Sequence, residues 1–67
     1  MSHYLFVHPS NQFTNLRNGP SMLCNNSYFL IPNNVNVIKA DKENDWSYIF
    51  YNSNYGWVKT EYLRKIS

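Results

Sequence analysis

Turn-forming residues interrupt this chain so often that no regular element can be long. Pro, Gly and Asn follow each short apolar run, at residues 9, 18–20, 32–34 and 52–54, and a polar run fills residues 41–45. Gly and Asn tolerate backbone conformations that other residues avoid, and Pro cannot donate to a strand ladder. No window of a dozen residues carries apolar side chains at helical spacing. Short strands with turns between them therefore predict an all-β fold.

The apolar runs between these turns predict strands at residues 4–7, 14–17, 28–31, 35–40, 46–51, 55–59 and 63–66. The first is short and is stopped by Pro9, so we expect it at an edge of the sheet. In the second, Thr14 and Leu16 alternate with polar residues, which marks a half-buried strand. Residues 41–45 are expected to form an exposed hairpin turn, and residues 60–62 a single helical turn.

A chain of 67 residues is expected to form one domain, residues 1–67. A core this small must be dense in large side chains, because ordering costs roughly 1.5 kcal/mol per residue. The composition supplies them, since 18% of the residues are aromatic. Two full sheets would need more chain, so we expect a small, strongly bent barrel.

Charge and cysteine content narrow the class of protein. The net charge is only +2 and no basic run exists, which argues against nucleic-acid binding. Cys24 is the single cysteine, so an internal disulfide is impossible.

No apolar run approaches the roughly 20 residues of a membrane span, so we expect no membrane insertion. The run 4–7 lacks the features of a signal peptide. If Met1 is the native start we expect a cytoplasmic protein, and an extracellular or periplasmic one if the chain is a processed or excised fragment.

Three segments carry a resemblance to a known family. "NLRNGPS" at residues 15–21 is followed by "WSYIFY" at 46–51 and "GWVKTEYL" at 56–63. In this order they resemble the bacterial SH3-type domain over about residues 14–66. The resemblance implies an SH3-like barrel of five to seven short strands, with a 3-10 turn near residues 60–62 and a binding role without catalysis. The family is usually exported and often attached to a cell-wall hydrolase.

The chain departs from the family at two positions. Thr14 stands where a large aliphatic residue is usual, and Asn34 stands where Gly is usual. Asn is the next best residue for a left-handed turn, so we expect that conformation at Asn34.

The corner after residue 17 is expected to serve the fold first, because Gly19-Pro20 directs the following loop through unusual backbone. Arg17 lies opposite Leu16 in the strand alternation, so it should be exposed or paired. Asn15 is expected to bond to loop backbone. Both polar residues are also candidates for contact with a partner.

The strand 46–51 places its aromatic residues by parity. Ser47, Ile49 and Tyr51 share one face, and the resemblance implies that Ile49 and Tyr51 point into the barrel. The other face then carries Trp46, Tyr48 and Phe50. Exposed aromatic patches mark interaction surfaces, but residues 4–7 could instead cover these rings.

A second aromatic set is expected near the end of the chain. Trp57 should form core or a groove wall, and Gly56 should allow close approach of a neighbouring backbone. The resemblance implies that Tyr62 lines a groove near Trp46. An aromatic groove suits an extended peptide.

Catalytic and metal sites find little support. Cys24, His3 and His8 are the only residues for a nucleophile–base pair, and as zinc ligands they lack a fourth member. We therefore expect no enzyme activity, no cofactor and no metal.

The sequence thus predicts a binding module that recognises a protein or extended peptide through an aromatic surface, as an intracellular or phage-encoded inhibitor or adaptor. The residues expected to contact the partner are Trp46, Tyr48, Phe50, Trp57, Tyr62, Asn15 and Arg17. The partner could be a different protein or a second copy forming a homodimer. The alternative is a module for the peptide part of peptidoglycan, and a nucleic-acid-binding barrel is third.

Overall fold

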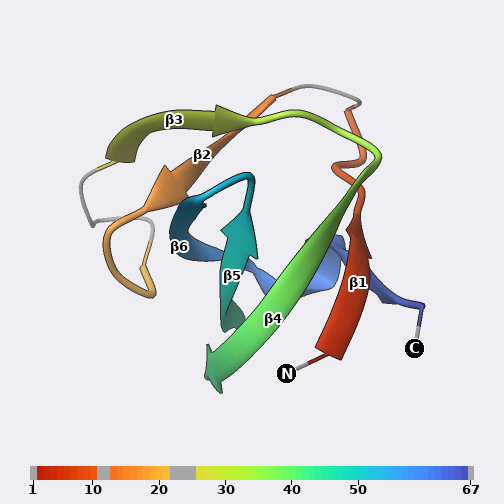
Figure 1. Cartoon of the computed structure of the whole chain (residues 1–67). Helices are drawn as coiled ribbons and strands as arrows, with labels where there is room; N and C mark the ends of the chain where they lie inside the picture. The colour runs from red at the N-terminus through yellow and green to blue at the C-terminus, as the bar shows by residue number, and fades with distance from the viewer. Residues whose placement is uncertain (1, 11–12, 22–25, 67) are drawn as a thin grey trace.

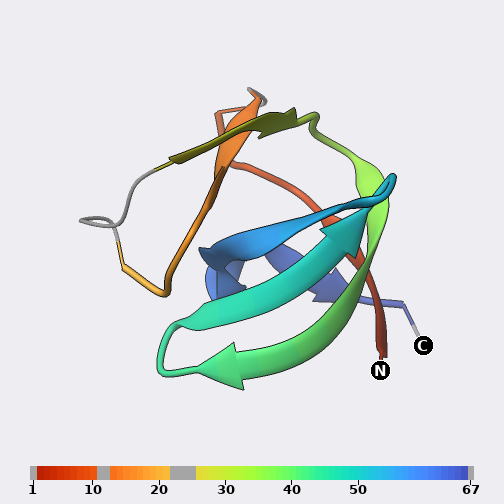
Figure 2. The same ribbon diagram turned by 60° about the vertical axis from the view of Figure 1, so that its left-hand side comes forward.

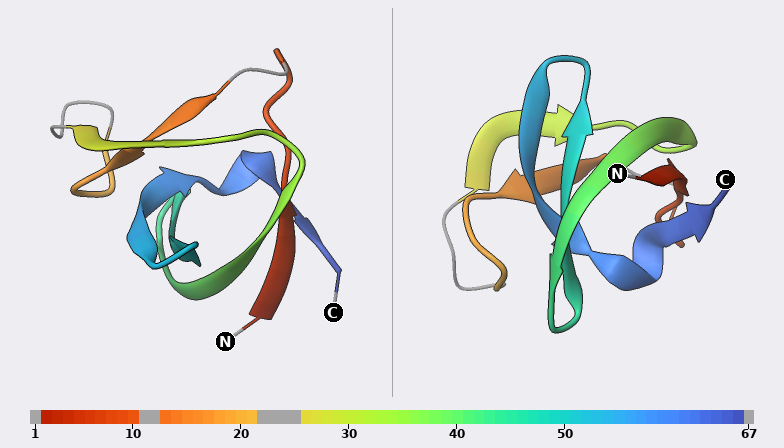
Figure 3. Two further views of the ribbon diagram at one scale, coloured as in Figure 1. Left: turned by 45° about the horizontal axis from the view of Figure 1, so that its top comes forward. Right: turned by 60° about the horizontal axis from the view of Figure 1, so that its bottom comes forward.

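The computed structural model describes residues 2–10, 13–21 and 26–66, with residues 26–29 described by their backbone alone. Its elements are β1 (Ser2–Phe6), β2 (Thr14–Arg17), β3 (Asn26–Ile31), β4 (Val35–Glu43), β5 (Trp46–Tyr51), β6 (Asn54–Lys59), the 3-10 turn η1 (Thr60–Tyr62) and β7 (Leu63–Lys65). The strands form one antiparallel sheet in the order β3-β2-β6-β5-β4-β1-β7, curled into a half-barrel (Figures 1 and 3). The all-β prediction is confirmed, and so is the 3-10 turn at residues 60–62.

The strands β4, β5 and β6 form a continuous meander, which Figure 2 shows as a curved ribbon. Both of its turns use residues with left-handed backbone, with φ of 54° at Asn44 and 50° at Asn52. Asn34, before β4, also has φ of 58°, as expected. The expected turn over residues 41–45 is too long, because β4 continues to Glu43 and pairs with β5 up to Trp46.

The prediction that the first strand lies at an edge is wrong. β1 pairs with β4 on one side and with β7 on the other, with Tyr4 opposite Val37 and Lys65. Pro9 ends the strand as expected, but the C-terminal residues return to cover its second side. A link beyond β1 reinforces this return, since the Val7 N–H donates to the Tyr62 carbonyl at 2.7 Å. The edges of the sheet are β3 and β7.

The core lies inside the curl, and each strand contributes one buried side chain to it. These are Phe6, Leu16, Ile31, Val37, Ile49, Val58 and Leu63. The alternation read from the sequence is therefore confirmed at Leu16 and Ile49. Tyr51 packs against this core while remaining partly buried, which agrees with its expected inward direction. Because the sheet curls, side chains from strands that are not neighbours meet inside it. Together they shield the small core from solvent on several sides.

Gly56 is the point at which β2 docks onto β6. A Cβ at Gly56 would lie 2.9 Å from Leu16 Cβ and 3.0 Å from the Arg17 carbonyl oxygen. The absence of a side chain therefore permits the close approach that the sequence predicts. At Gly19 the expectation of unusual backbone is wrong, because neither described glycine has a positive φ.

Replacing Gly56 by Ala should destabilise the fold, because the new methyl group would push β2 away from β6. We expect the free energy of unfolding to fall by about 1–3 kcal/mol, the usual cost of overpacking. Denaturant unfolding measures this change, with Lys65→Ala on the exposed end of β7 as the control. Equal stability of Gly56→Ala and the parent chain would show that β2 can move without cost.

Candidate functional site

The outer face of the β5–β6 hairpin carries paired aromatic residues. In the register of these strands Tyr48 lies opposite Trp57, and Phe50 lies opposite Tyr55. The ring centroids of Tyr48 and Trp57 are 5.2 Å apart, those of Tyr48 and Tyr55 are 5.8 Å apart, and those of Phe50 and Tyr55 are 5.6 Å apart. We call these four residues the outer aromatic cluster. Such cross-strand ring pairs stabilise a hairpin and present one continuous apolar surface.

Part of this cluster is open to solvent. Phe50 is 39% exposed and Tyr55 is 62% exposed, while Tyr48 and Trp57 are half-buried. The alternative in which residues 4–7 cover these rings is wrong. Phe6 lies in the core and Tyr4 packs against it, so this segment covers the inside of the sheet. The outer aromatic cluster is therefore a surface feature.

The cluster also changes the chemistry of one phenol. Burial against its neighbours raises the pKa of Tyr48 above the ordinary tyrosine value, and the nearby Tyr55 hydroxyl raises it further. The uncharged phenol is thus the form that this surface favours.

Trp46 is less exposed than the sequence predicts. Its position alternates with Ser47 as predicted, and it lies opposite Glu43 and Lys59 in the outer rows. Its side chain is nevertheless only 9% exposed. Trp46 lines two hollows of the surface.

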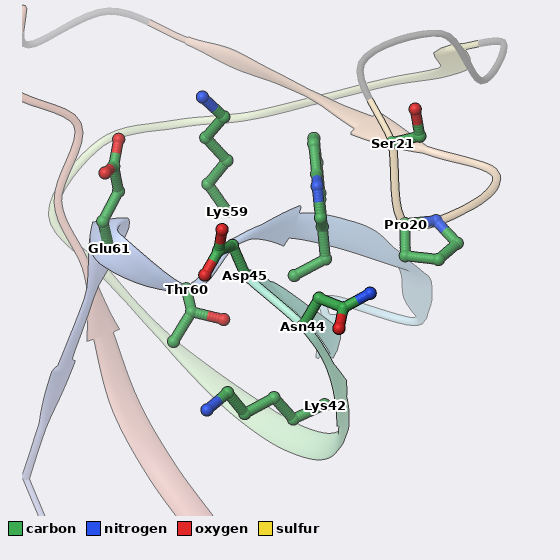
Figure 4. Close-up of a pocket in the computed structure, with 9 residues that line it drawn as sticks. Pro20, Ser21, Lys42, Asn44, Asp45, Lys59, Thr60 and Glu61 are labelled. Carbon is green, nitrogen blue, oxygen red and sulfur yellow. The ribbon is translucent and has the colours of Figure 1, made fainter.

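The larger hollow lies between the corner after β2 and the start of η1, and we call it the corner hollow. Its volume is about 600 Å³, and it is lined by Pro20, Ser21, Lys42, Asn44, Asp45, Trp46, Lys59, Thr60 and Glu61. Figure 4 shows Pro20 and Ser21 on one side and Lys59, Asp45 and Glu61 on the other, with Asn44 between them. Pro20 and Ser21 of the Gly-Pro-Ser corner therefore form one wall of this hollow.

The smaller hollow, of about 190 Å³, lies where β2 and β6 diverge. These strands pair at Arg17 and Trp57 in the described part of the chain, and beyond that position a gap opens. Its lining comprises His8, Phe13, Thr14, Asn15, Arg17, Trp46, Val58, Lys59 and Tyr62. The expected proximity of Tyr62 to Trp46 is confirmed. The expected bond between Asn15 and loop backbone stays a prediction.

Two hydrogen bonds hold the walls of both hollows in place. Ser47 is fully buried, and its hydroxyl lies 2.6 Å from the Thr60 hydroxyl. The Thr60 N–H donates to the Asp45 carbonyl at 2.8 Å. These two bonds tie η1 to the start of β5, next to Trp46.

The structure thus divides the seven predicted contact residues into two groups. Trp46, Tyr62, Asn15 and Arg17 line the small hollow, while Tyr48, Phe50 and Trp57 belong to the outer aromatic cluster. Tyr55, the most exposed ring of the cluster, is not among the predicted contact residues. The turn was predicted at residues 52–54, whereas Asn54 already pairs with Tyr51. A two-residue turn at Asn52-Ser53 would have placed Tyr55 opposite Phe50.

No family model, curated protein or solved structure significantly matches this chain.

Over residues 2–10, 13–21 and 26–66, no three His, Cys, Asp or Glu side chains come close enough to hold a metal ion. None of the helices described there is long and apolar enough to span a membrane. The His8 Nδ1 accepts from the Ser10 N–H at 3.1 Å and lies 2.7 Å from the Ser10 hydroxyl, and the His8 ring centroid lies 4.6 Å from that of Tyr62. Cys24 lies outside the described residues.

The raised pKa of Tyr48 predicts a loss of stability in alkali. The folded chain holds this proton more tightly than the unfolded chain, whose tyrosine pKa is about 10. The free energy of unfolding should therefore be unaffected by this group below pH of about 10 and fall as pH rises through the folded pKa. NMR titration of the tyrosine rings, with Tyr48→Phe to assign the signal, measures the pKa. In Tyr55→Phe the upward shift should shrink but persist, and a Tyr48 pKa below the ordinary value would contradict this account.

Proposed function

We propose that this chain is a non-catalytic binding module that recognises a protein partner through its outer aromatic cluster. The observation that carries the proposal is the exposure of Phe50 and Tyr55 beside the half-buried rings of Tyr48 and Trp57. Contiguous apolar patches on small soluble domains usually mark interaction sites. Aromatic anchors also contribute a large share of interface energy, because they bury much area at little conformational cost.

We further propose that the domain is of the bacterial SH3 type and acts as an inhibitor or adaptor. The curled half-barrel is compatible with SH3-like barrels. Support comes from the three sequence segments in family order and from the 3-10 turn directly before the last strand. The hollow between the corner at Pro20 and the turn at Asn44 gives further support.

The charges around the cluster favour a protein partner over a nucleic acid. Asp41 lies beside Tyr48 and Glu43 beside Trp46 on the outer face, while Arg17 and Lys59 lie on the other side of the rings. A phosphate backbone crossing this face would meet carboxylates as well as cations. Mixed charges around an aromatic centre are instead typical of the rim of a protein interface.

A second candidate is a module for the peptide part of peptidoglycan, bound in the small hollow. The specific observation is Thr14 Oγ1, which is buried and has no hydrogen-bond partner among the described residues. Thr14 lines the hollow beside Trp46 and Tyr62. A buried hydroxyl without a partner is costly, and a rotation of the Thr14 side chain into the hollow would let an amide or carboxylate of a bound peptide satisfy it.

Photo-crosslinking tests which surface contacts a protein. A benzophenone amino acid in place of Tyr55 should yield adducts with a protein in the native cell. The matched control is the same substitution at Phe13, which is 65% exposed and lines the small hollow. Tyr48→Ser with Phe50→Lys should leave the fold intact and weaken association by on the order of 2–4 kcal/mol. Adducts at position 13 but not at 55 would overturn the proposal, and unfolding of the double variant would show that the rings belong to the core.

Co-sedimentation with purified peptidoglycan tests the second candidate. Retention of the parent chain, with loss on Thr14→Val, is the expected result if the small hollow binds wall peptide. This variant keeps the shape of the side chain and removes only the hydroxyl. The Tyr48→Ser, Phe50→Lys variant is the control, because its changes lie outside that hollow. No retention of the parent chain would remove this candidate.

A further inference from the structure

The outer face has opposite charges on its two sides. Across β4, β5, β6 and β2, the pairings place Asp41, Tyr48, Trp57 and Arg17 in one row. The next row along the strands reads Glu43, Trp46 and Lys59. Both rows therefore carry an acid on the β4 side and a base on the β6 and β2 side, with rings between them.

An irregularity in β4 puts the first acid in its row. Lys39 pairs with Ile49, but the next pair is Asp41 with Tyr48, so Ala40 is an extra residue in the ladder. In a regular ladder Ala40 would lie opposite Tyr48. Bulges of this kind re-aim side chains and tend to occur at functional surfaces. The bulge thus places Asp41 opposite Tyr48 in the ladder, with its carboxylate accepting the Lys42 N–H at 2.7 Å.

We propose that the partner of this face is a second copy of the chain, bound in a symmetric dimer whose two-fold axis runs along the strands between β5 and β6. This inference rests on the proposed function of the outer aromatic cluster. Rotation about this axis brings each row of one copy over the same row of the other copy in reversed order. Asp41 of one copy therefore faces Arg17 of the other, and this contact occurs twice per dimer. Glu43 of each copy then lies beside Lys59 of the other.

The same axis matches the rings. It sets Tyr48 of one copy over Trp57 of the other, and Phe50 over Tyr55. A two-fold axis across the strands would instead set Asp41 over Asp41 and Arg17 over Arg17, which like-charge repulsion disfavours. The charge pattern therefore selects both the occupant and its orientation.

The shape of the face sets the strength of the contact. A standard stable interface buries about 800 Å² per partner, which is roughly a fifth of the 4416 Å² surface of this chain. The outer face of a curled sheet is convex, so contact is confined to the ring rows and their flanking charges. The dimer is therefore weak, depends on concentration and dissociates as salt screens its charge pairs.

A charge-exchange experiment tests this dimer. Sedimentation equilibrium over a concentration series should show self-association of the parent chain. Asp41→Arg alone and Arg17→Asp alone each create two like-charge pairs and should raise the dimer dissociation constant about tenfold or more. An equimolar mixture of the two variants restores every opposite pair, so association should return as a heterodimer. Lys65→Asp, a charge reversal on β7 away from this face, should leave the dissociation constant unchanged.

Circular dichroism melting shows whether each variant folds, and the pair Glu43→Arg with Lys59→Asp gives an independent exchange if Arg17→Asp does not. A parent chain that is monomeric throughout the series would overturn the dimer, as would a mixture that associates no better than the single variants. If position 55 still forms adducts with a different protein in that case, the proposed function stands and the second copy is excluded as its partner.

Discussion

The close approach of β2 to β6 at Gly56 is the constraint on which the rest of the structure depends. The sheet order joins β3 to the other strands through β2, and β2 through β6. A side chain at Gly56 would meet Leu16, so the contact requires glycine. Without this docking, Leu16 and Ile31 would leave the core, and both hollows beside Trp46 would lose the wall that β2 and its corner supply.

The two faces of β5 divide between the core and the proposed partner surface. Ile49 on the inner face is fully buried in the core, and buried Ser47 ties the strand to η1 through Thr60. The outer residues Tyr48 and Phe50 form a ring surface with β6. Because neighbouring residues point to opposite faces, the outer aromatic cluster can change without altering the core, provided that the register is kept.

Local patterns predicted the elements of this fold well, since alternation at Leu16 and Ile49 and the Asn-rich turns depend on neighbours in sequence. Features that depend on strand pairing could not be predicted from neighbouring residues. The interior position of β1 needs the return of the last strand, and the place of Asp41 needs a bulge that no residue type announces. The grouping of the predicted contact residues into two surfaces could not be predicted from the sequence either. The separation of Trp46 from the outer cluster follows from where β2 leaves β6.

The pairing of the first strand with the last has a mechanical consequence. Tyr4 lies opposite Lys65 and Phe6 opposite Leu63, so the two ends of the chain leave the sheet side by side (Figure 1). A pull on both ends would load the bonds of this antiparallel pair one after another from the open end, as in a zipper, and not all at once. Little force is needed to separate strands in that geometry. Phe6 and Leu63 form the last pair of this ladder to open, and they would be the first core residues to be exposed. A domain joined through both ends to larger bodies would therefore yield early under tension and act as an extensible link between them.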